Sequence, residues 1–391
     1  MKLAHTEPPS AVPAAAHILG EPTIEGLARY ILQSDVRRIL VLVGAGASVA
    51  AGIPDFRSPD TGIYANLGKY NLDDPSDAFS LTLLRERPDI FYSIATEMNL
   101  WPGHFRPTAV HFFIRLLQEQ GRLLRCCTQN IDGLEEAAGI SPRLLVEAHG
   151  SFATASCIDC HAPFDIEQNK KEAMEGVVSH CLLCGGIVKP NVVFFGESLP
   201  DAFFHALQHD APTADLVIIV GTSLQVHPFA SLPFFVPTTI PRVVINRERV
   251  GGSFFRFPDD DDVPDSAEGL AATSSAASSS SSRPLLAGDG VGADSGDGHR
   301  SAAASTAPES IAATRESNEE GREEDAASSS SSSSDGYAQY GDYDVHPPLC
   351  RDVLFRGDCQ DNVKKLAECL GWGAALSDFL GTSTASSEDE H

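Results

Sequence analysis

The chain has 391 residues, of which 42% are hydrophobic, and its formal net charge is −26 at pH 7. This length and apolar content suit a protein with a buried core and more than one domain. The acidic balance excludes the basic surface of a non-specific nucleic-acid binder, and no apolar run reaches the roughly 18 residues of a membrane span. We therefore expect neither direct nucleic-acid binding nor membrane insertion.

Residues 1–22 are rich in Ala and Pro, and we expect them to be disordered and to lack a secretory leader. The nine cysteines are then expected to stay reduced, because disulfide frameworks belong to oxidising compartments. This pattern predicts a cytoplasmic protein, and an additional nuclear share is an open alternative.

Helical and apolar segments alternate from residue 23 onward. Helical spacing is expected over residues 24–36 and 107–121, and continuous apolar strands over 38–43, 122–130, 143–150, 214–223 and 241–248. Strands that are apolar on both faces belong to parallel sheets covered by helices. The order predicts an α/β fold with a Rossmann-like, doubly wound parallel sheet.

The composition changes completely over residues 257–345. Residues 258–345 hold 19 Asp and Glu against 4 Lys and Arg, together with long serine runs. Such a segment cannot bury enough apolar area to offset chain entropy, so it is predicted to be a disordered insertion. Residues 346–380 are expected to complete the α/β fold, with Val363, Leu366, Ala367 and Leu370 on one helical face. Residues 381–391 are expected to form a disordered tail.

Four cysteines occur as two C-x-x-C pairs separated by twenty residues: Cys157, Cys160, Cys181 and Cys184. Thiolates three positions apart can bind one metal from a tight turn, and two such turns complete a tetrahedral zinc site. Because four protein ligands leave no open position, the zinc is predicted to be structural, in a small lobe over about residues 151–190. The alternatives are free cysteines, a nucleic-acid-binding zinc ribbon, or a ligand role for the flanking His161 or His180.

A glycine turn follows the first predicted strand in "VGAGASVAAGIPDFRSP", residues 43–59. Gly44 and Gly46 would let the backbone approach a diphosphate at the start of a helix. Position 49, where the Rossmann fingerprint has a third glycine, is Val. A tight turn without a ligand is therefore an open alternative, and so is an ordinary polar loop over "IPDFRSP".

Two polar segments lie where predicted strands end. "TQNID", residues 128–132, offers amides and a carboxylate for ribose and carboxamide groups, or else it merely caps the next helix. His149 ends the following strand and is a candidate proton acceptor near neutral pH. A lone histidine is more often structural.

Together these motifs resemble the sirtuins, the NAD-dependent protein lysine deacylases. The matching strings are "GAGAS", "GIPDFRSP", "TQNID", "HG", the cysteine pairs, "FGE", "GTSLQV", "VIN" and, beyond the insertion, "GDCQ". "CTQNIDGLE", "VFFGESLP" and "GTSLQVHPFASL" look most like the subgroup with the mammalian cytosolic tubulin and histone deacetylase. The resemblance implies NAD and one structural zinc ion as cofactors, with NAD and an acyl-lysine peptide bound between a Rossmann-like domain and a zinc lobe.

The resemblance also implies the site residues. His149 and Asn130 would be catalytic, and His149 would deprotonate a ribose hydroxyl after the nicotinamide bond has been cleaved. The predicted cofactor-binding residues are Ala45, Gly46, Ala47, Ser48, Val49, Asp55, Phe56, Arg57, Gln129, Asn130, Ile131, Asp132, Thr222, Ser223, Asn246, Arg247, Glu248 and Cys359.

The implied activity is NAD-dependent deacetylation of protein lysines, with transfer of the acetyl group to ADP-ribose. The peptide would add as a strand between "VVFFGES" and "TSLQV", and histone tails and tubulin are the expected substrates. Two alternatives are a mono-ADP-ribosyltransferase and a catalytically silent NAD-responsive scaffold.

Overall fold

The computed structural model describes residues 17–55, 64–70, 72, 74–257 and 350–385. Of the predicted insertion, residues 258–345 lie outside the described residues, and only Phe257 lies inside them. Phe257 is buried and stacks on Phe255.

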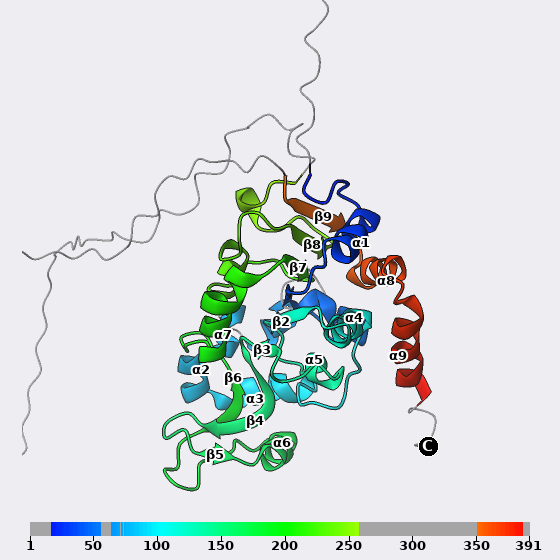
Figure 1. Ribbon diagram of the computed structural model, residues 1–391. Helices are drawn as coiled ribbons and strands as arrows, with labels where there is room; N and C mark the ends of the chain where they lie inside the picture. The colour runs from blue at the N-terminus through cyan, green and yellow to red at the C-terminus, as the bar shows by residue number, and fades with distance from the viewer. Residues whose placement is uncertain (1–16, 56–63, 71, 73, 258–349, 386–391) are drawn as a thin grey trace, which may run out of the picture. The chain divides into compact units, whose positions relative to one another are not determined.

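A six-stranded parallel sheet forms the larger part of the fold (Figure 1). Its strand order is β3-β2-β1-β7-β8-β9, and each neighbouring pair is parallel. The strands are β1 (Ile39–Val43), β2 (Leu123–Thr128), β3 (Leu145–Glu147), β7 (Leu216–Val220), β8 (Arg242–Asn246) and β9 (Asp352–Arg356). This confirms the predicted doubly wound sheet, whose order reverses between β1 and β7.

Helices cover both faces of this sheet because its central strands are apolar on both sides. Ile39, Val41 and Val43 pack against one set of helices, whereas Leu40 and Leu42 pack on the opposite face. The first set comprises α1 (Ile24–Gln33), α4 (Ala109–Glu119), α8 (Cys359–Cys369) and α9 (Gly373–Ala385), and α7 (Asp201–His205) lies on the opposite face (Figure 1).

A smaller lobe contains an antiparallel sheet with strand order β5-β4-β6. Phe91, Phe152 and Phe194 form the centre of its aromatic core. The elements of this part are α2 (Leu81–Glu86), α3 (Pro88–Glu97), β4 (Gly150–Cys157), β5 (Pro163–Phe164), α6 (Ile166–Met174) and β6 (Val188–Val192). The strand pair β4 and β6 connects this lobe to the end of β3.

The structure corrects two predicted boundaries. His17, placed in the predicted disordered N-terminus, is buried, and its Nε2 lies 3.1 Å from the carbonyl oxygen of Asp352 on the edge strand β9. At the other end, α9 continues to Ala385 instead of ending at residue 380. Phe379, just inside the predicted boundary, stacks on Phe112 of α4 and packs this end of α9 against the core.

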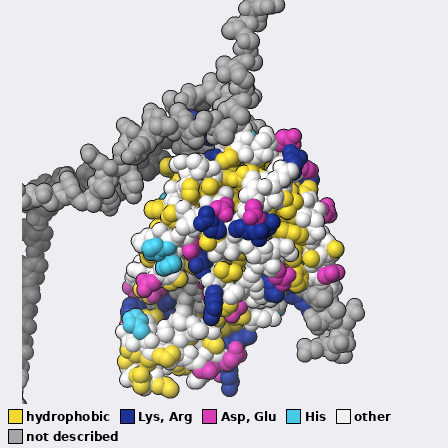
Figure 2. Space-filling view, viewed as in Figure 1, with side chains coloured by type: hydrophobic (Ala, Val, Ile, Leu, Met, Phe, Trp, Pro, Cys, Tyr) yellow, Lys and Arg dark blue, Asp and Glu magenta, His cyan; other side chains and the backbone are white. Residues whose placement is uncertain are grey.

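In the part of the chain that the structure describes, no helix combines the length and apolarity needed to cross a membrane. On the face shown in Figure 2, Lys and Arg side chains are interspersed with Asp and Glu side chains. This face therefore carries no continuous basic surface of the kind that nucleic-acid binders present.

Candidate active site and zinc centre

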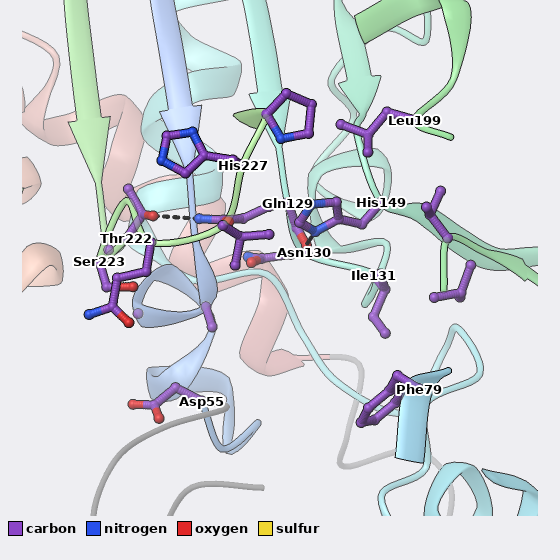
Figure 3. Close-up of a pocket in the computed structure, with 18 of the residues that line it drawn as sticks. Asp55, Phe79, Gln129, Asn130, Ile131, His149, Leu199, Thr222, Ser223 and His227 are labelled. Atoms are coloured by element: carbon purple, nitrogen blue, oxygen red, sulfur yellow. Dashed lines mark hydrogen bonds between the residues drawn. The ribbon is translucent and has the colours of Figure 1, made fainter. Parts of the chain in front are cut away.

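A pocket of about 500 Å³ lies at the carboxyl ends of β1, β2, β7 and β8. Open α/β sheets bind their ligands at this edge, where the strand order reverses. The side chains in Figure 3 converge on the pocket from several separate loops. Of the predicted residues, those that line it are Ala45, Gly46, Val49, Asp55, Gln129, Asn130, Ile131, His149, Thr222, Ser223, Asn246, Arg247, Glu248 and Cys359.

The glycine turn after β1 packs directly against the turn after β7. A Cβ atom on Gly44 would lie 2.6 Å from the carbonyl oxygen of Gly221, and a Cβ atom on Gly46 would lie 2.8 Å from the Cα of Gly221. Both glycines are therefore required by this backbone contact, a reason different from the predicted approach to a diphosphate. Gly46 additionally lines the pocket.

Asn130 is held in place by the glycine turn. Its Nδ2 donates to the carbonyl oxygen of Gly44 at 3.1 Å and to Oγ of Ser48 at 3.3 Å. Both amide hydrogens are thus used, and Oδ1 is the group that this buried side chain can offer to a ligand. The neighbouring Gln129 donates from Nε2 to the hydroxyl of Thr222, which joins the loops after β2 and β7 (Figure 3).

His149 lies between β3 and β4, on the pocket wall near Asn130 (Figure 3). Its Nδ1 is 2.9 Å from the carbonyl oxygen of Gln129. A carbonyl accepts only, so Nδ1 carries the hydrogen and Nε2 is left as an acceptor. Burial lowers the pKa of His149, although the Gln129 carbonyl acts in the opposite direction. The imidazole is therefore a neutral base near pH 7.

Ala47, Ser48 and Asp132 lie behind the pocket wall instead of on it. Ala47 and Ser48 are buried, and Ser48 donates from Oγ to Oδ2 of Asp132 at 2.7 Å. Oδ1 of Asp132 accepts from the backbone N–H of Leu134 at 3.0 Å, at the start of α5 (Leu134–Ala137). Of the two residues proposed as helix caps, only Asp132 reaches α5, where it accepts from the first N–H although the N-cap position is Gly133, and it also supports the loop that bears Asn130.

The remaining predicted cofactor residues surround the other end of the pocket. Thr222 and Ser223 follow β7, Asn246 ends β8, and Cys359 begins α8, so residues distant in sequence meet here. Asp55 lies at the lower edge of the view in Figure 3. Phe56 and Arg57 lie outside the described residues.

Residues beyond the predicted cofactor set also line the pocket. The segment from Val192 to Glu197 forms one side, and Gln225 to Pro228 forms another. The first segment lies in "VVFFGES", and the second overlaps "TSLQV" at Gln225 and Val226, the two strings between which the peptide is expected to bind. Phe79 was missed, since nothing in "DAFS" signals a site, yet its carbonyl accepts from the N–H of Phe195 at 2.9 Å.

The four predicted zinc ligands converge in the small lobe. The Sγ atoms of Cys157 and Cys184 are 3.4 Å apart, those of Cys160 and Cys184 are 3.4 Å apart, and those of Cys160 and Cys181 are 3.5 Å apart. A tetrahedral zinc site with bonds of ~2.3 Å requires sulfur separations of about 3.8 Å, which small adjustments of these side chains reach. The four thiols therefore fit one zinc ion.

The two cysteine turns have the same backbone design. In each, the Sγ of the first cysteine accepts from a backbone N–H two residues later, that of Asp159 or of Leu183, at 3.4 Å. Such bonds favour the thiolate that a metal requires. His161 and Gly185 occupy the matching left-handed position after each pair, with φ of 57° and 76°. His161 is therefore a turn residue, and neither it nor His180 belongs to the metal-ligand cluster.

Comparisons with known proteins agree with this arrangement. The Sir2 family matches residues 44–228. The chain is 67% identical over 380 residues to the NAD-dependent protein deacetylase SIR2rp1 of Leishmania major, with 95% of each chain covered. It is 50% identical over 365 residues to the protein of the same name in Trypanosoma brucei brucei, with 93% of this chain and 92% of the relative covered. It is also 47% identical over 240 residues to the NAD-dependent protein deacetylase sirtuin-2 of Danio rerio, with 61% of this chain and 63% of the relative covered. At this identity and coverage, the chain belongs to the Sir2 family, the sirtuins.

Proposed function

We propose that this sirtuin is an NAD-dependent protein lysine deacetylase that transfers the acetyl group of acetyl-lysine to ADP-ribose and releases nicotinamide. The observation that carries the proposal is the placement of His149. Its free Nε2 acceptor shares one pocket with Asn130 and lies beside both segments expected to bind a peptide.

The pocket residues fit a dinucleotide. The volume of the pocket, about 500 Å³, is in the usual range for cofactor sites. The hydroxyls of Thr222 and Ser223 and the turn after β1 would hold the phosphates, and Asn246 to Glu248 would hold the adenine ribose. Gln129, Asn130 and Ile131 line the part nearest His149, where they would orient the nicotinamide and its ribose.

When bound, NAD would supply the electron-poor ribose carbon with which the acyl oxygen of the lysine reacts as nicotinamide leaves. The protein contributes mainly orientation, because a weak nucleophile reacts only when it is held within attack distance. His149 contributes proton transfer: Nε2 accepts a ribose hydroxyl proton, while the Nδ1 hydrogen bond to Gln129 keeps the ring in the right tautomer. The resulting imidazolium would then give this proton to the departing lysine nitrogen as the acyl group passes to the ribose oxygen.

The zinc has a structural role in this proposal. Four cysteine ligands leave no open coordination position for a substrate or a water molecule. None of the four cysteines lines the pocket. The metal would instead stabilise the turns at one end of β4 and β6, whose other end borders the active site.

Acetylated histone tails and tubulin are the proposed protein substrates. The acetyl-lysine itself is neutral, so the net charge of −26 would act through basic residues flanking it. Strand addition along Val193 to Glu197 would rely on main-chain hydrogen bonds, which carry little sequence preference. We also propose a cytoplasmic location with a nuclear share, because the zinc thiolates require a reducing compartment.

The test uses purified full-length protein with acetylated histone and tubulin peptides. Mass spectrometry with and without NAD should show lysine release only with NAD, accompanied by equal amounts of nicotinamide and O-acetyl-ADP-ribose. Deacetylation without NAD would contradict the proposal. In H149A, deacetylation should be lost; transfer of labelled ADP-ribose to protein that persists in this variant would indicate a separate ADP-ribosyltransferase activity. Cell fractionation tests the location.

A further inference from the structure

A second group of ionisable side chains lies behind the pocket. The group consists of His111 of α4, Asp132 just before α5, and Glu135 within α5. One ligand atom of each residue lies within 4.8 Å of the ligand atoms of the other two. His111 and Glu135 are 0% and 1% exposed. In the described part of the chain, Nε2 of His111 and Oε1 of Glu135 have no hydrogen-bond partner. Since buried polar atoms without a partner are costly, this cluster requires an explanation.

The protonation of His111 is determined by the start of its helix. The backbone N–H of Thr108 donates to Nδ1 of His111 at 3.1 Å, so Nδ1 is an acceptor and Nε2 carries the hydrogen. Burial lowers the pKa of His111 to about 4. The ring is therefore neutral at pH 7, with a single N–H available inside the cluster. The Thr108 hydroxyl donates to the carbonyl oxygen of Ala47 at 2.9 Å, which links this helix to the glycine turn.

Glu135 is buried among groups that disfavour its ionisation. Burial is the largest cause that raises its pKa, to about 8, and the nearby carboxylates of Asp132 and Glu147 raise it further. The other groups that face it are Thr128 and Cys126 of β2 and His111 of α4; of these, the Thr128 hydroxyl lowers the pKa. At neutral pH Glu135 is accordingly a carboxylic acid that can donate a hydrogen.

Asp132 connects this cluster to the active site. It accepts from Ser48 at 2.7 Å, and Ser48 in turn accepts from Nδ2 of Asn130 at 3.3 Å. Asn130 lines the pocket. A change in the charge around Asp132 is therefore transmitted through two hydrogen bonds to a residue proposed to orient nicotinamide.

We propose that Glu135 is a positioning residue that acts as a neutral acid: its carboxyl hydrogen and the Nε2 hydrogen of His111 stabilise the Asp132 carboxylate, which holds Ser48 and Asn130 in their active arrangement. The inference rests on the proposed function for its catalytic consequence. Ionisation of Glu135 would place two negative charges side by side within the protein and would disturb this arrangement.

The activity test compares E135Q with the wild type between pH 6.5 and 9.5. Glutamine retains the shape and the donor of the neutral acid but cannot ionise. With a pKa of about 8, the protonated fraction of Glu135 falls about tenfold between pH 7 and pH 9. The ratio of nicotinamide release by E135Q to that by the wild type should rise by the same factor. The adjacent, exposed Glu136 is the matched control, and the ratio for E136Q should stay constant. A constant ratio for E135Q would overturn the proposal.

A second measurement does not depend on activity. A glutamate with a raised pKa binds a proton in the folded state that it releases in the unfolded state, so it contributes a loss of stability as the pH rises from about 4.5 to about 8. The Tm of E135Q minus that of the wild type should therefore increase over this range and level off above it, and a flat difference would contradict a protonated Glu135.

If neither protein releases nicotinamide, the proposed function fails, while the Tm measurement still decides whether Glu135 is protonated. A second metal ion per chain that E135Q lacks would show that the cluster binds a cation, and would also overturn the proposal.

Discussion

Nδ1 of His149 donates its hydrogen to the carbonyl oxygen of Gln129 at 2.9 Å, so one loop bears both residues of the pocket end proposed to hold nicotinamide and the group that orients the proposed base. Gln129 also donates from Nε2 to the hydroxyl of Thr222 after β7, so the residue whose carbonyl orients His149 is held by a contact between the loops after β2 and β7, which lie on either side of β1.

The first prediction concerns the pH dependence of catalysis. Burial lowers the pKa of His149 below its ordinary value of 6.5, and only the neutral ring can accept a proton. The acidic limb of kcat/KM for the acetylated peptide should therefore have its midpoint below pH 6.5. H149A should lose at least about 100-fold in deacetylation rate, the usual lower bound for a general base. A midpoint clearly above pH 6.5 would contradict the assignment.

The second prediction concerns the buried ion pair between Arg242 and Asp352. Both side chains are only 4% exposed, and Arg242 donates to Asp352 from Nε and Nη2 at 2.7 Å each. R242M leaves a buried carboxylate without its partner and should lower the free energy of unfolding by about 3–5 kcal/mol.

Urea denaturation at pH 7 measures this loss, with the exposed pair Arg87 and Asp89 as the matched control. Their side chains are 60% and 58% exposed, so R87M should cost at most about 1 kcal/mol. The double variant R242M/D352L should recover much of the loss, because it removes both charges. An equal cost for R242M and R87M would show that burial does not strengthen the pair. Arg242 also donates to the carbonyl oxygen of Phe254 at 3.0 Å, so the pair braces residues on both sides of the insertion.

The third prediction concerns the zinc turns. Gly185 and His161 occupy equivalent left-handed positions, but only glycine adopts this conformation without steric cost. G185A should destabilise the small lobe by about 1–2 kcal/mol and should accelerate zinc release to a chelator. H161G should not accelerate it. Metal analysis should find one zinc ion per chain in both variants and none in C181S. Equal release rates for G185A and the wild type would be inconsistent with a strained turn.

The fourth prediction concerns the edge of the pocket where the peptide is proposed to bind. Lys189 is 6% exposed, donates to the carbonyl oxygen of Val192 at 2.6 Å and pairs with Glu197 at 3.1 Å. Glu197 also accepts from the N–H of Phe194 at 2.7 Å. This pair therefore shapes the segment that lines one side of the pocket.

K189M should raise the KM for an acetylated peptide about tenfold or more, equivalent to at least about 1.4 kcal/mol. The KM for NAD should change much less, because the residues proposed to bind the cofactor lie on other loops. The exposed Lys171 provides the control, and K171M should leave both constants unchanged. Equal increases in the two KM values would indicate general damage to the pocket.

Much of the chemistry could be predicted from local patterns. The apolar runs at β1, β2, β7 and β8 indicated a parallel sheet, because strands buried on both faces need apolar residues at every position. The spacing of the four cysteines indicated their convergence, because each pair binds from a single tight turn. The sequence also predicted that His149 and Asn130 lie at the ends of strands and therefore close together, because the carboxyl ends of parallel strands lie along one edge of the sheet.

The sequence by itself thus determined the sheet and the zinc ligands, which follow from residue period and short spacings, and the resemblance to the sirtuins indicated many residues of the pocket wall. Only the tertiary structure decided that Ser48 and Asp132 support the wall from behind, that Gly44 is required by Gly221, and that His111 and Glu135 meet inside the protein. These contacts join segments far apart in the chain. They depend on strand order and on the packing of α4 against the sheet, which no local pattern of residues records.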